Sequence, residues 1–422
     1  MKNKTAALLL SLAASMLCAC SSAAVAESGK DTSQRKETAA AQSITQAEAS
    51  AEQQDGAQES TSAFSEPMPN TRAAELFLQD RPERIKEIYR TLYEGMFSYT
   101  QSIELPKGVI SSDDFGDLLE MVTMTGVCAD AMESDYKMYV DESSCVSRIV
   151  LSYTRTREDG ASEYARLMKR AKQIAADAAS LDSDYAKVKY FHDTIVLGCT
   201  YTSDAPYAHT AYGALVDGNA VCEGYAKAFQ LLCELSGITA VPVSGSAVDS
   251  DGLVQSHMWN KVLLDGEWYN VDCTWDDPTG SLYKDNKRYD YFLVSDGVLA
   301  ISHTEDTNTY MPEPNAWDET GSYFEREGLV LGYTTDVYSE LYNAAALCFA
   351  GGLPDDTIRF LCFDGELYND IDELYFTDTD EHEARFKEIL RNFMEDGEQV
   401  SYAIMSEPRT RVISVRILRD RS

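Results

Sequence analysis

The hydrophobic pattern divides most of the chain into alternating helical and strand-like segments. Four helices are predicted from apolar residues at helical spacing, at residues 73–96, 113–132, 163–179 and 185–197. Strands are predicted at residues 97–105 and, as a pair joined by a polar turn, at residues 137–154. The tail repeats the order strand, helix and hairpin, at residues 358–363, 381–394 and 400–418. Two flanking α+β units of similar design are therefore expected.

Between the flanks lies a predicted helix that begins at a cysteine. After a turn-prone stretch at residues 217–219, one face of the next segment is apolar, with Ala226, Phe229, Leu232 and Cys233. Gly237 is a plausible stop. Cys222 then lies in the first turn, where the helix dipole favours a thiolate and unbonded N–H groups can donate to an oxyanion. Gly224 is expected to leave open space beside it. A cysteine at a helix start is most often a small buried residue, so the prediction depends on a second segment.

That second segment, SHMWNKVLLDGEWYNVDCTW, contains two strand-like runs around Asp265 and Gly266. Asp-Gly is a strong signal for a two-residue hairpin turn. With these two residues as the loop, His257 and Asp272 project from one face as diagonal neighbours. The carboxylate can then orient the imidazole, and the imidazole can take a proton from Cys222. A slip of one residue in the hairpin would separate the pair.

Three runs in the middle of the chain carry a family resemblance: YGALVDGNAVCEGYAKAFQLLCELSGI, SHMWNKVLLDGEWYNVDCTWDDP and YDYFLVSD. In this order they closely resemble the transglutaminase-like superfamily, and more narrowly the bacterial exported proteins that carry its core, over about residues 181–310. The resemblance implies a papain-like α+β core, with the nucleophile on a helix N-terminus packed against an antiparallel sheet. It further implies Cys222 as nucleophile, His257 as general base and acid, and Asp272 as the residue that orients the histidine.

Five further residues are expected to shape the pocket. Tyr212, Gly224 and Tyr225 match aromatic and glycine positions that the resemblance implies. His209 precedes the nucleophile segment and could line the cleft, although a satisfied loop histidine is commoner. Trp259 is first of all a core aromatic, and could also form a wall of the acyl pocket.

The other histidines and an acidic pair receive structural interpretations. His192 lies on an amphipathic helix before the core and is expected to be structural. His303 and His382 have no partner pattern. No EF-hand spacing surrounds Asp276 and Asp277, so they are expected to form a turn before Pro278 rather than a calcium site.

The first twenty residues predict export. Lys2 and Lys4 precede an apolar run that is too short to span a bilayer as a permanent helix. The run ends in Leu-Cys-Ala-Cys, which resembles the lipobox of bacterial lipoproteins and implies that Cys20 is lipidated and residues 1–19 are removed. A plain secretory signal cut near residues 23–26 is the alternative.

The number and spacing of the cysteines are compatible with an exported protein and do not indicate a metal site. Of ten cysteines, Cys18 leaves with the signal peptide and Cys20 takes the lipid. The others could pair in an oxidising compartment, but a catalytic Cys222 leaves at least one more as a thiol. None has the tight CxxC spacing of zinc ligands, so neither a metal nor a cofactor is expected. Cys233 is expected to be a small core residue.

Composition excludes little, but charge excludes two classes of partner. The 422 residues are 44% hydrophobic and 25% charged, as in ordinary globular proteins. Asp and Glu total 70 against 36 Lys and Arg, for a formal net charge of -34. Nucleic acids and anionic lipid headgroups bind basic surfaces, so neither is expected as a partner of this acidic protein. The expected contact with the membrane is through the lipid anchor at Cys20.

Together these observations predict a signal peptide (1–19), a lipidated, disordered tether (20–70), an N-terminal α+β region (71–180), a catalytic core (181–310) and a C-terminal α+β domain (311–422). The expected function is that of a thiol enzyme on the outer face of the cell membrane, or of an outer membrane, acting on peptide or protein amides, cell-wall peptide included. Hydrolysis is favoured over transamidation, because excluding water requires special architecture. The alternative is a non-catalytic, lipid-anchored binding or scaffold protein that retains the fold.

Overall fold

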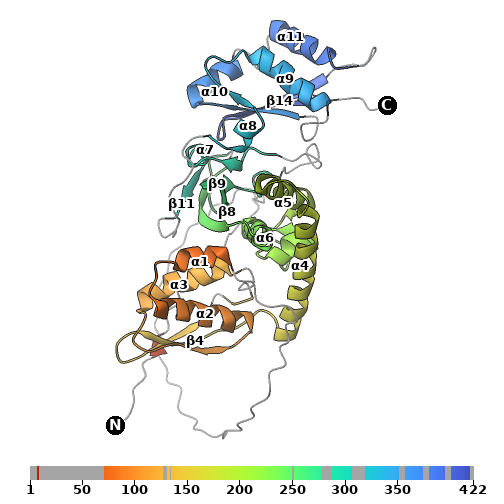
Figure 1. The fold of residues 1–422 in the computed structure, drawn as a ribbon. Coiled ribbons are helices and arrows are strands. Elements are labelled where there is room, and N and C mark those ends of the chain that lie inside the picture. The colour runs from red at the N-terminus through yellow and green to blue at the C-terminus, as the bar shows by residue number, and fades with distance from the viewer. Residues whose placement is uncertain are drawn as a thin grey trace, which may run out of the picture.

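The computed structural model describes residues 7–8, 71–126, 131–133, 135–249, 251–277, 288–306, 319–350, 357–373, 380–394 and 401–418. They form three α+β units that follow one another along an elongated molecule, each built on its own sheet (Figure 1). Apart from Ala7 and Leu8, the predicted signal peptide, Cys20 and the predicted tether lie outside the described residues.

The N-terminal unit places three helices against a small antiparallel sheet. Its helices are α1 (Arg72–Leu78), α2 (Glu83–Phe97) and α3 (Ser112–Thr125). Its strands are β1 (Ala7–Leu8), β2 (Ser102–Glu104), β3 (Lys137–Val140) and β4 (Val146–Val150), in the order β1-β3-β4-β2. Strand β1 comes from the predicted signal peptide, and its Ala7 and Leu8 pair antiparallel with Tyr139 and Met138 of β3.

Two predicted elements of this unit differ from the structure. The single helix expected over residues 73–96 is two helices that break at Pro82, because proline lacks an N–H and disfavours a helical residue before it. The helix expected to run to residue 132 ends at Gly126, whose N–H bonds to the carbonyl of Val122.

The central unit packs helices against a five-stranded antiparallel sheet of order β10-β9-β8-β7-β11. Its helical elements are α4 (Arg157–Ala178), α5 (Asp184–Gly198), the π-helical turn η1 (Gly213–Asp217), α6 (Cys222–Leu235), α7 (Asp296–Leu299) and α8 (Tyr323–Arg326). Its strands are β5 (Thr200–Tyr201), β6 (Asn219–Ala220), β7 (Ala240–Val248), β8 (Val254–Leu264), β9 (Glu267–Val271), β10 (Phe292–Val294) and β11 (His303–Glu305). Helix α6 lies against β7 and β8, and ends before Gly237, whose φ of 79° only glycine adopts readily.

Three strands of the C-terminal unit repeat an arrangement found in the N-terminal one. It contains β12 (Val330–Leu331), α9 (Val337–Phe349), β13 (Thr357–Cys362), α10 (Gly365–Ile371), α11 (Asp380–Arg391), β14 (Ser401–Glu407) and β15 (Val412–Leu418). In both units a strand after a helix pairs antiparallel with the second strand of a later hairpin: β2 with β4, and β13 with β15. The two sheets thus share a three-strand arrangement, whereas their fourth strands differ: β1 pairs antiparallel with β3, and β12 pairs parallel with β13.

No helix among the described residues combines the length and apolar character needed to cross a membrane.

Candidate active site

Cys222 is the first residue of helix α6, as the hydrophobic pattern predicted. Its side chain is 3% exposed and packs with Ala226 on the next turn and with Met258 on β8. Met258 is the chain neighbour of His257. The contact therefore brings the start of α6 against the part of β8 that carries the histidine.

The start of α6 has no polar cap, unlike most helices of this protein. A serine, threonine or aspartate side chain caps α1, α3, α4, α5, α7, α8, α9 and α10. At α6 the cap position is Val221, whose side chain makes no hydrogen bond. The first N–H groups of a helix have no acceptor within that helix, so the start of α6 is suited to donate to an acceptor beside the thiol.

Gly224 has a different role from the one expected of it. The space beside it is filled, because a Cβ there would lie 2.5 Å from the carbonyl oxygen of Ala208 and 2.9 Å from that of Thr210. Glycine thus allows the segment that contains His209 to cross the first turn of α6 at close range. The backbone N–H of Val221, which donates to the carbonyl of Ala208, fixes the same crossing.

His209 belongs to a charged group next to Cys222. Its Nδ1 lies 2.9 Å from Glu223 Oε2, and the buried Lys227 ammonium lies 2.7 Å from Glu223 Oε1. Burial alone would raise the pKa of Glu223, but the charges and hydrogen bonds of Lys227 and His209 outweigh it and lower the pKa to about 2. Glu223 is therefore an anion whose charge is met by its two neighbours.

The β8–β9 hairpin has the predicted register. Asp265 and Gly266, at φ of 55° and 91°, form the loop, and Leu264 pairs with Glu267. The expected contact follows, since His257 Nε2 lies 2.6 Å from Asp272 Oδ2, directly after the end of β9.

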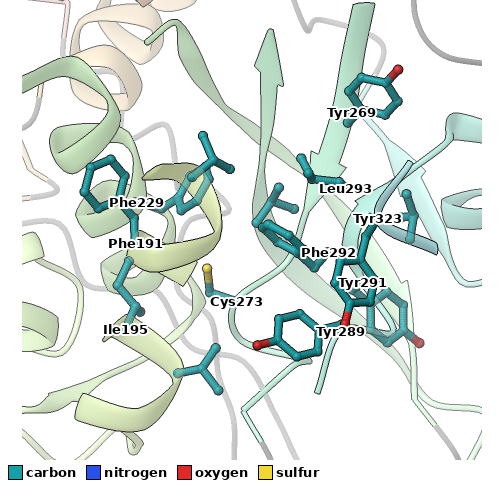
Figure 2. Packing of buried hydrophobic residues seen from close by; sticks show 14 of the residues in the cluster. Phe191, Ile195, Phe229, Tyr269, Cys273, Tyr289, Tyr291, Phe292, Leu293 and Tyr323 are labelled. Atoms are coloured by element: carbon teal, nitrogen blue, oxygen red, sulfur yellow. The ribbon is translucent and has the colours of Figure 1, made fainter. Parts of the chain in front are cut away.

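Asp272 is fixed on both sides. The next residue, Cys273, is buried between Phe191 and Phe229 on the helical side and Phe292 on the sheet side (Figure 2). The N–H of Asp272 donates to the carbonyl of Tyr291 on the neighbouring segment. The turn that carries the carboxylate is thus anchored in the core.

The Asp272 carboxylate accepts four hydrogen bonds. Oδ1 accepts from the N–H groups of Thr274 and Trp275, at 2.9 and 3.1 Å. Oδ2 faces Nε2 of His257 and, at 3.2 Å, Nε2 of His303. Burial raises the pKa of this carboxyl, but the two histidines outweigh that and hold the pKa well below its usual range. Asp272 is therefore an anion, and both imidazoles donate an N–H to it.

His303 is the residue that sequence reasoning missed. It was expected to have no partner, yet it is 4% exposed and shares Asp272 with His257. It lies on β11, which pairs with β7 through His303 and Ala247. The local sequence around His303 cannot predict this contact, because β11 lies at the edge of the sheet and the contact depends on how the strands are ordered.

Aromatic side chains enclose the two histidines. The ring of Trp259 stacks on His257 at 6.1 Å between centroids and meets His303 edge-on at 5.1 Å. Trp275 lies 5.5 Å from His257 and 4.6 Å from His303. Trp259 is a core aromatic, as expected, and it also lies against His257. The C-terminal unit reaches this wall through Arg409, whose guanidinium lies 5.2 Å from the Trp275 ring.

The two tyrosines expected to shape the pocket are both buried. Tyr212 packs edge-on against Tyr207 and beneath Arg166 of α4. Tyr225, on α6, donates its hydroxyl hydrogen to Asp277 at 2.5 Å. Burial raises the pKa of Asp277 to about 6, against the opposing effect of this bond.

A second buried histidine–aspartate pair lies nearby. His192, on α5, is fully buried and has Nε2 3.1 Å from Asp276 Oδ2 and Nδ1 3.2 Å from Asp193 Oδ1. Asp276, expected only as a turn residue, is also fully buried and accepts from the N–H of Tyr291. It ties α5 to the turn after β9, which supports the structural interpretation of His192.

The described cysteines are thiols, namely Cys145, Cys199, Cys222, Cys233, Cys273, Cys348 and Cys362. Within the described residues one group of side chains is close enough to hold a metal ion: His257, Asp272 and His303, with ligand atoms within 4.8 Å. Hydrogen bonds account for this closeness, because both imidazoles donate to the one carboxylate.

Comparisons with known proteins find a family model that matches part of the central unit. Residues 172–273 match the family model of the transglutaminase-like superfamily. Mouse kyphoscoliosis peptidase is 30% identical over 100 residues, which cover 21% of this chain and 15% of the peptidase. The human peptidase is 29% identical over 100 residues with the same coverage. The chain thus spans only a small part of the curated relatives it matches.

Solved structures show partial similarity to this chain. A Cytophaga hutchinsonii protein described as a candidate cysteine protease is 22% identical, with a TM-score of 0.23, and covers 26% of this chain and 39% of that one. The periplasmic domain of TgpA from Pseudomonas aeruginosa, bound to ethylmercury, is 19% identical with a TM-score of 0.22, covering 35% and 63%.

The chain therefore carries a domain of the transglutaminase-like superfamily, within a mixed α+β fold. Both the family resemblance and the α+β fold class expected from the sequence are confirmed.

Proposed function

We propose that this protein is a thiol enzyme that attacks the amide carbonyl of a peptide or protein and forms an acyl-thioester on Cys222. One observation carries the proposal. The bonded His257–Asp272 pair lies on the hairpin that contacts the start of α6, where Cys222 opens a helix without a polar cap. A thiol, an oriented imidazole and the N–H donors of a helix start are the parts that acyl transfer requires.

The hydrogen bonds assign the protons of the pair. Asp272 is an anion and can only accept, so Nε2 of His257 carries its hydrogen toward that carboxylate. In the neutral imidazole Nδ1 is then bare. Nδ1 is therefore the atom that takes the proton of Cys222, and Asp272 stabilises the imidazolium that results.

The chemical steps follow from this assignment. The Cys222 thiolate attacks the carbonyl carbon, and the oxygen that becomes negative accepts hydrogen bonds from the first turn of α6. The intermediate collapses as the C–N bond breaks, and His257 gives its proton to the departing amine. Water then attacks the thioester while His257 takes one of its protons, which releases a carboxylic acid and restores the thiol.

Hydrolysis is the proposed fate of the thioester, and an amine acceptor is the competing one. Incubation with a peptide substrate and a large excess of a primary amine distinguishes them. Under hydrolysis the product gains the mass of water. If the amine adduct predominates in the mass spectrum while water is in excess, the protein is a transglutaminase.

Export and lipid anchoring at Cys20 complete the proposal, supported by the sequence of residues 1–20. Cys20→Ser is expected to move the protein from the membrane fraction to a soluble one. Lipid attached to Cys18 in that variant would place the processing site elsewhere.

The decisive test is the pH dependence of Cys222 alkylation by iodoacetamide, measured on digested peptides by mass spectrometry. Other thiols in the same sample serve as controls, because Cys145 is half-buried and Cys233 fully buried, and neither adjoins a histidine–aspartate pair. Cys222 is expected to react well below the usual thiol pKa of about 8.5, and this advantage is expected to vanish in His257→Ala.

A Cys222 that reacts no faster than Cys145 at every pH, in both proteins, would rule out a primed thiol. The protein would then be a lipid-anchored binding or scaffold protein. Binding of a partner that survives Cys222→Ala would point the same way.

A further inference from the structure

We propose that His303 is a positioning residue of the thiol site. It donates its Nε2–H to the same carboxylate oxygen that His257 uses, and so holds Asp272 in place and weakens the attraction of that carboxylate for the His257 proton. This role rests on the function proposed above.

The tautomer of His303 is fixed by its two partners. Asp272 Oδ2 lies 3.2 Å from Nε2 and can only accept, so Nε2 carries the hydrogen. Nδ1 is then an acceptor, and the Ser302 hydroxyl lies 2.8 Å from it and donates to it. The Ser302 hydroxyl thus selects the His303 tautomer that can reach Asp272. The two hydrogen bonds therefore indicate that His303 serves as a hydrogen-bond donor to Asp272 and does more than pack against its neighbours.

The shared oxygen makes the two histidines competitors. Each hydrogen bond accepted by a carboxylate spreads its negative charge and reduces what it offers to the next donor. His257 lies closer, at 2.6 Å against 3.2 Å for His303. Loss of the His303 donor would leave Oδ2 to His257 alone, and the imidazolium form of His257 would gain stability.

The charged and titratable groups around His303 come from several elements. They are His257 from β8, Asp272 from the turn after β9, Tyr291 before β10 and Arg409 from the β14–β15 turn. Burial, the largest influence, lowers the pKa of His303, and its bond to Asp272 opposes this without reversing it. Burial thus favours the neutral form of His303, which is the form that donates Nε2–H to Asp272 while its Nδ1 accepts from Ser302.

The test compares His303→Phe with His303→Gln in the full chain. Phenylalanine keeps a ring among the aromatics but cannot donate, whereas the glutamine amide can donate to Asp272. The five histidines of the chain allow selective ¹⁵N labelling, and NMR titration then follows the His257 imidazole directly. In His303→Phe the pKa of His257 is expected to rise by about half to one unit, and in His303→Gln to return toward the wild-type value.

Ser302→Ala is the companion variant if the phenylalanine substitution prevents folding. It frees the other tautomer of His303, whose bare Nε2 cannot donate to Asp272, so a smaller rise in the pKa of His257 is expected. An unchanged His257 titration in every variant that folds would overturn the proposal and leave His303 as a packing residue.

Cys222 alkylation separates this proposal from the proposed function. In His303→Phe a more basic His257 is expected to shift the onset of Cys222 labelling to lower pH. If Cys222 labels slowly in all variants while the His257 titration still depends on His303, the thiol function fails and the positioning role stands. If Cys222 is primed but the His257 titration never moves, the positioning role fails alone.

Discussion

Two buried histidine–aspartate pairs lie in the central unit, and they differ in what surrounds them. His257–Asp272 and His192–Asp276 both join an Nε2 atom to a buried carboxylate, and the two aspartates lie four residues apart on one turn. The first pair lies on the hairpin that meets Cys222. The second ties helix α5 to the core.

Their electrostatics differ as well. Against the effect of burial, the two histidines hold the pKa of Asp272 low, whereas burial outweighs the single histidine at Asp276 and raises the pKa of that carboxyl. A buried histidine–aspartate pair is thus no catalytic signature by itself. What distinguishes the first pair is a fully bonded carboxylate on one side and a helix start with a thiol on the other.

The largest expected effect is the loss of acyl transfer in Cys222→Ala or His257→Ala, on the order of 10⁴-fold or more in kcat/KM. The reason is that one variant removes the nucleophile and the other its base. Peptide hydrolysis and thermal unfolding, measured on the same preparations, should show an inactive but folded chain. His192→Ala is the matched control, since it removes the other histidine and should keep kcat within about twofold in the folded fraction. A comparable loss of kcat in His257→Ala and His192→Ala would contradict the assignment of a catalytic role to the first pair alone.

Asp272→Asn is expected to lower kcat by about 10³- to 10⁴-fold, because the amide favours the wrong tautomer of His257. Asp276→Asn should leave kcat nearly unchanged. Steady-state kinetics on the two isosteric variants make the comparison. A large kcat effect at Asp276 would mean that the second pair also serves the reaction.

His192→Ala is expected to lower the free energy of unfolding by about 3 kcal/mol, since it leaves the fully buried Asp276 without its histidine partner. Urea unfolding followed by tryptophan fluorescence measures the loss. A change below about 0.5 kcal/mol would show that the pair contributes nothing to the core, as at an ordinary surface site.

The smallest expected effect is an opposite pH dependence of stability at the two pairs. The lowered pKa of Asp272 stabilises the fold above its unfolded value of about 3.9, and this contribution is lost as pH falls. Burial lowers the pKa of His192, but its bonds and charge attraction to Asp193 and Asp276 raise it overall. Its contribution is therefore complete below about pH 6.5 and is lost as pH rises through the folded pKa.

Urea unfolding across the pH range tests these signs. Asp272→Asn should flatten the acid limb of the stability curve, and His192→Gln should flatten the decline above neutrality. Parallel curves for wild type and both variants would contradict the assignment.

The sequence was sufficient where local chemistry decides the structure. The Asp265-Gly266 loop set the hairpin register, and with it the contact between His257 and Asp272. The apolar face that begins after Cys222 placed the cysteine at a helix start.

Prediction was incomplete where distant segments meet. His303 reaches Asp272 only because β11 joins the far edge of the sheet, and Asp276 is buried only because α5 covers it. The space beside Gly224 is likewise filled by residues well before it in the chain, at Ala208 and Thr210. Pairings of this kind depend on topology, which local spacing does not specify.

The absence of a polar N-cap side chain on helix α6 implies a trade-off between the stability of the fold and the proposed activity. A threonine at position 221 has nearly the shape of the valine it replaces, and its hydroxyl could accept from the first turn. Val221→Thr is therefore expected to strengthen the helix by up to about 1 kcal/mol while it draws away the N–H groups offered to the reacting carbonyl. A protein selected only to withstand heat would acquire that hydroxyl, whereas one selected for turnover would keep the apolar residue.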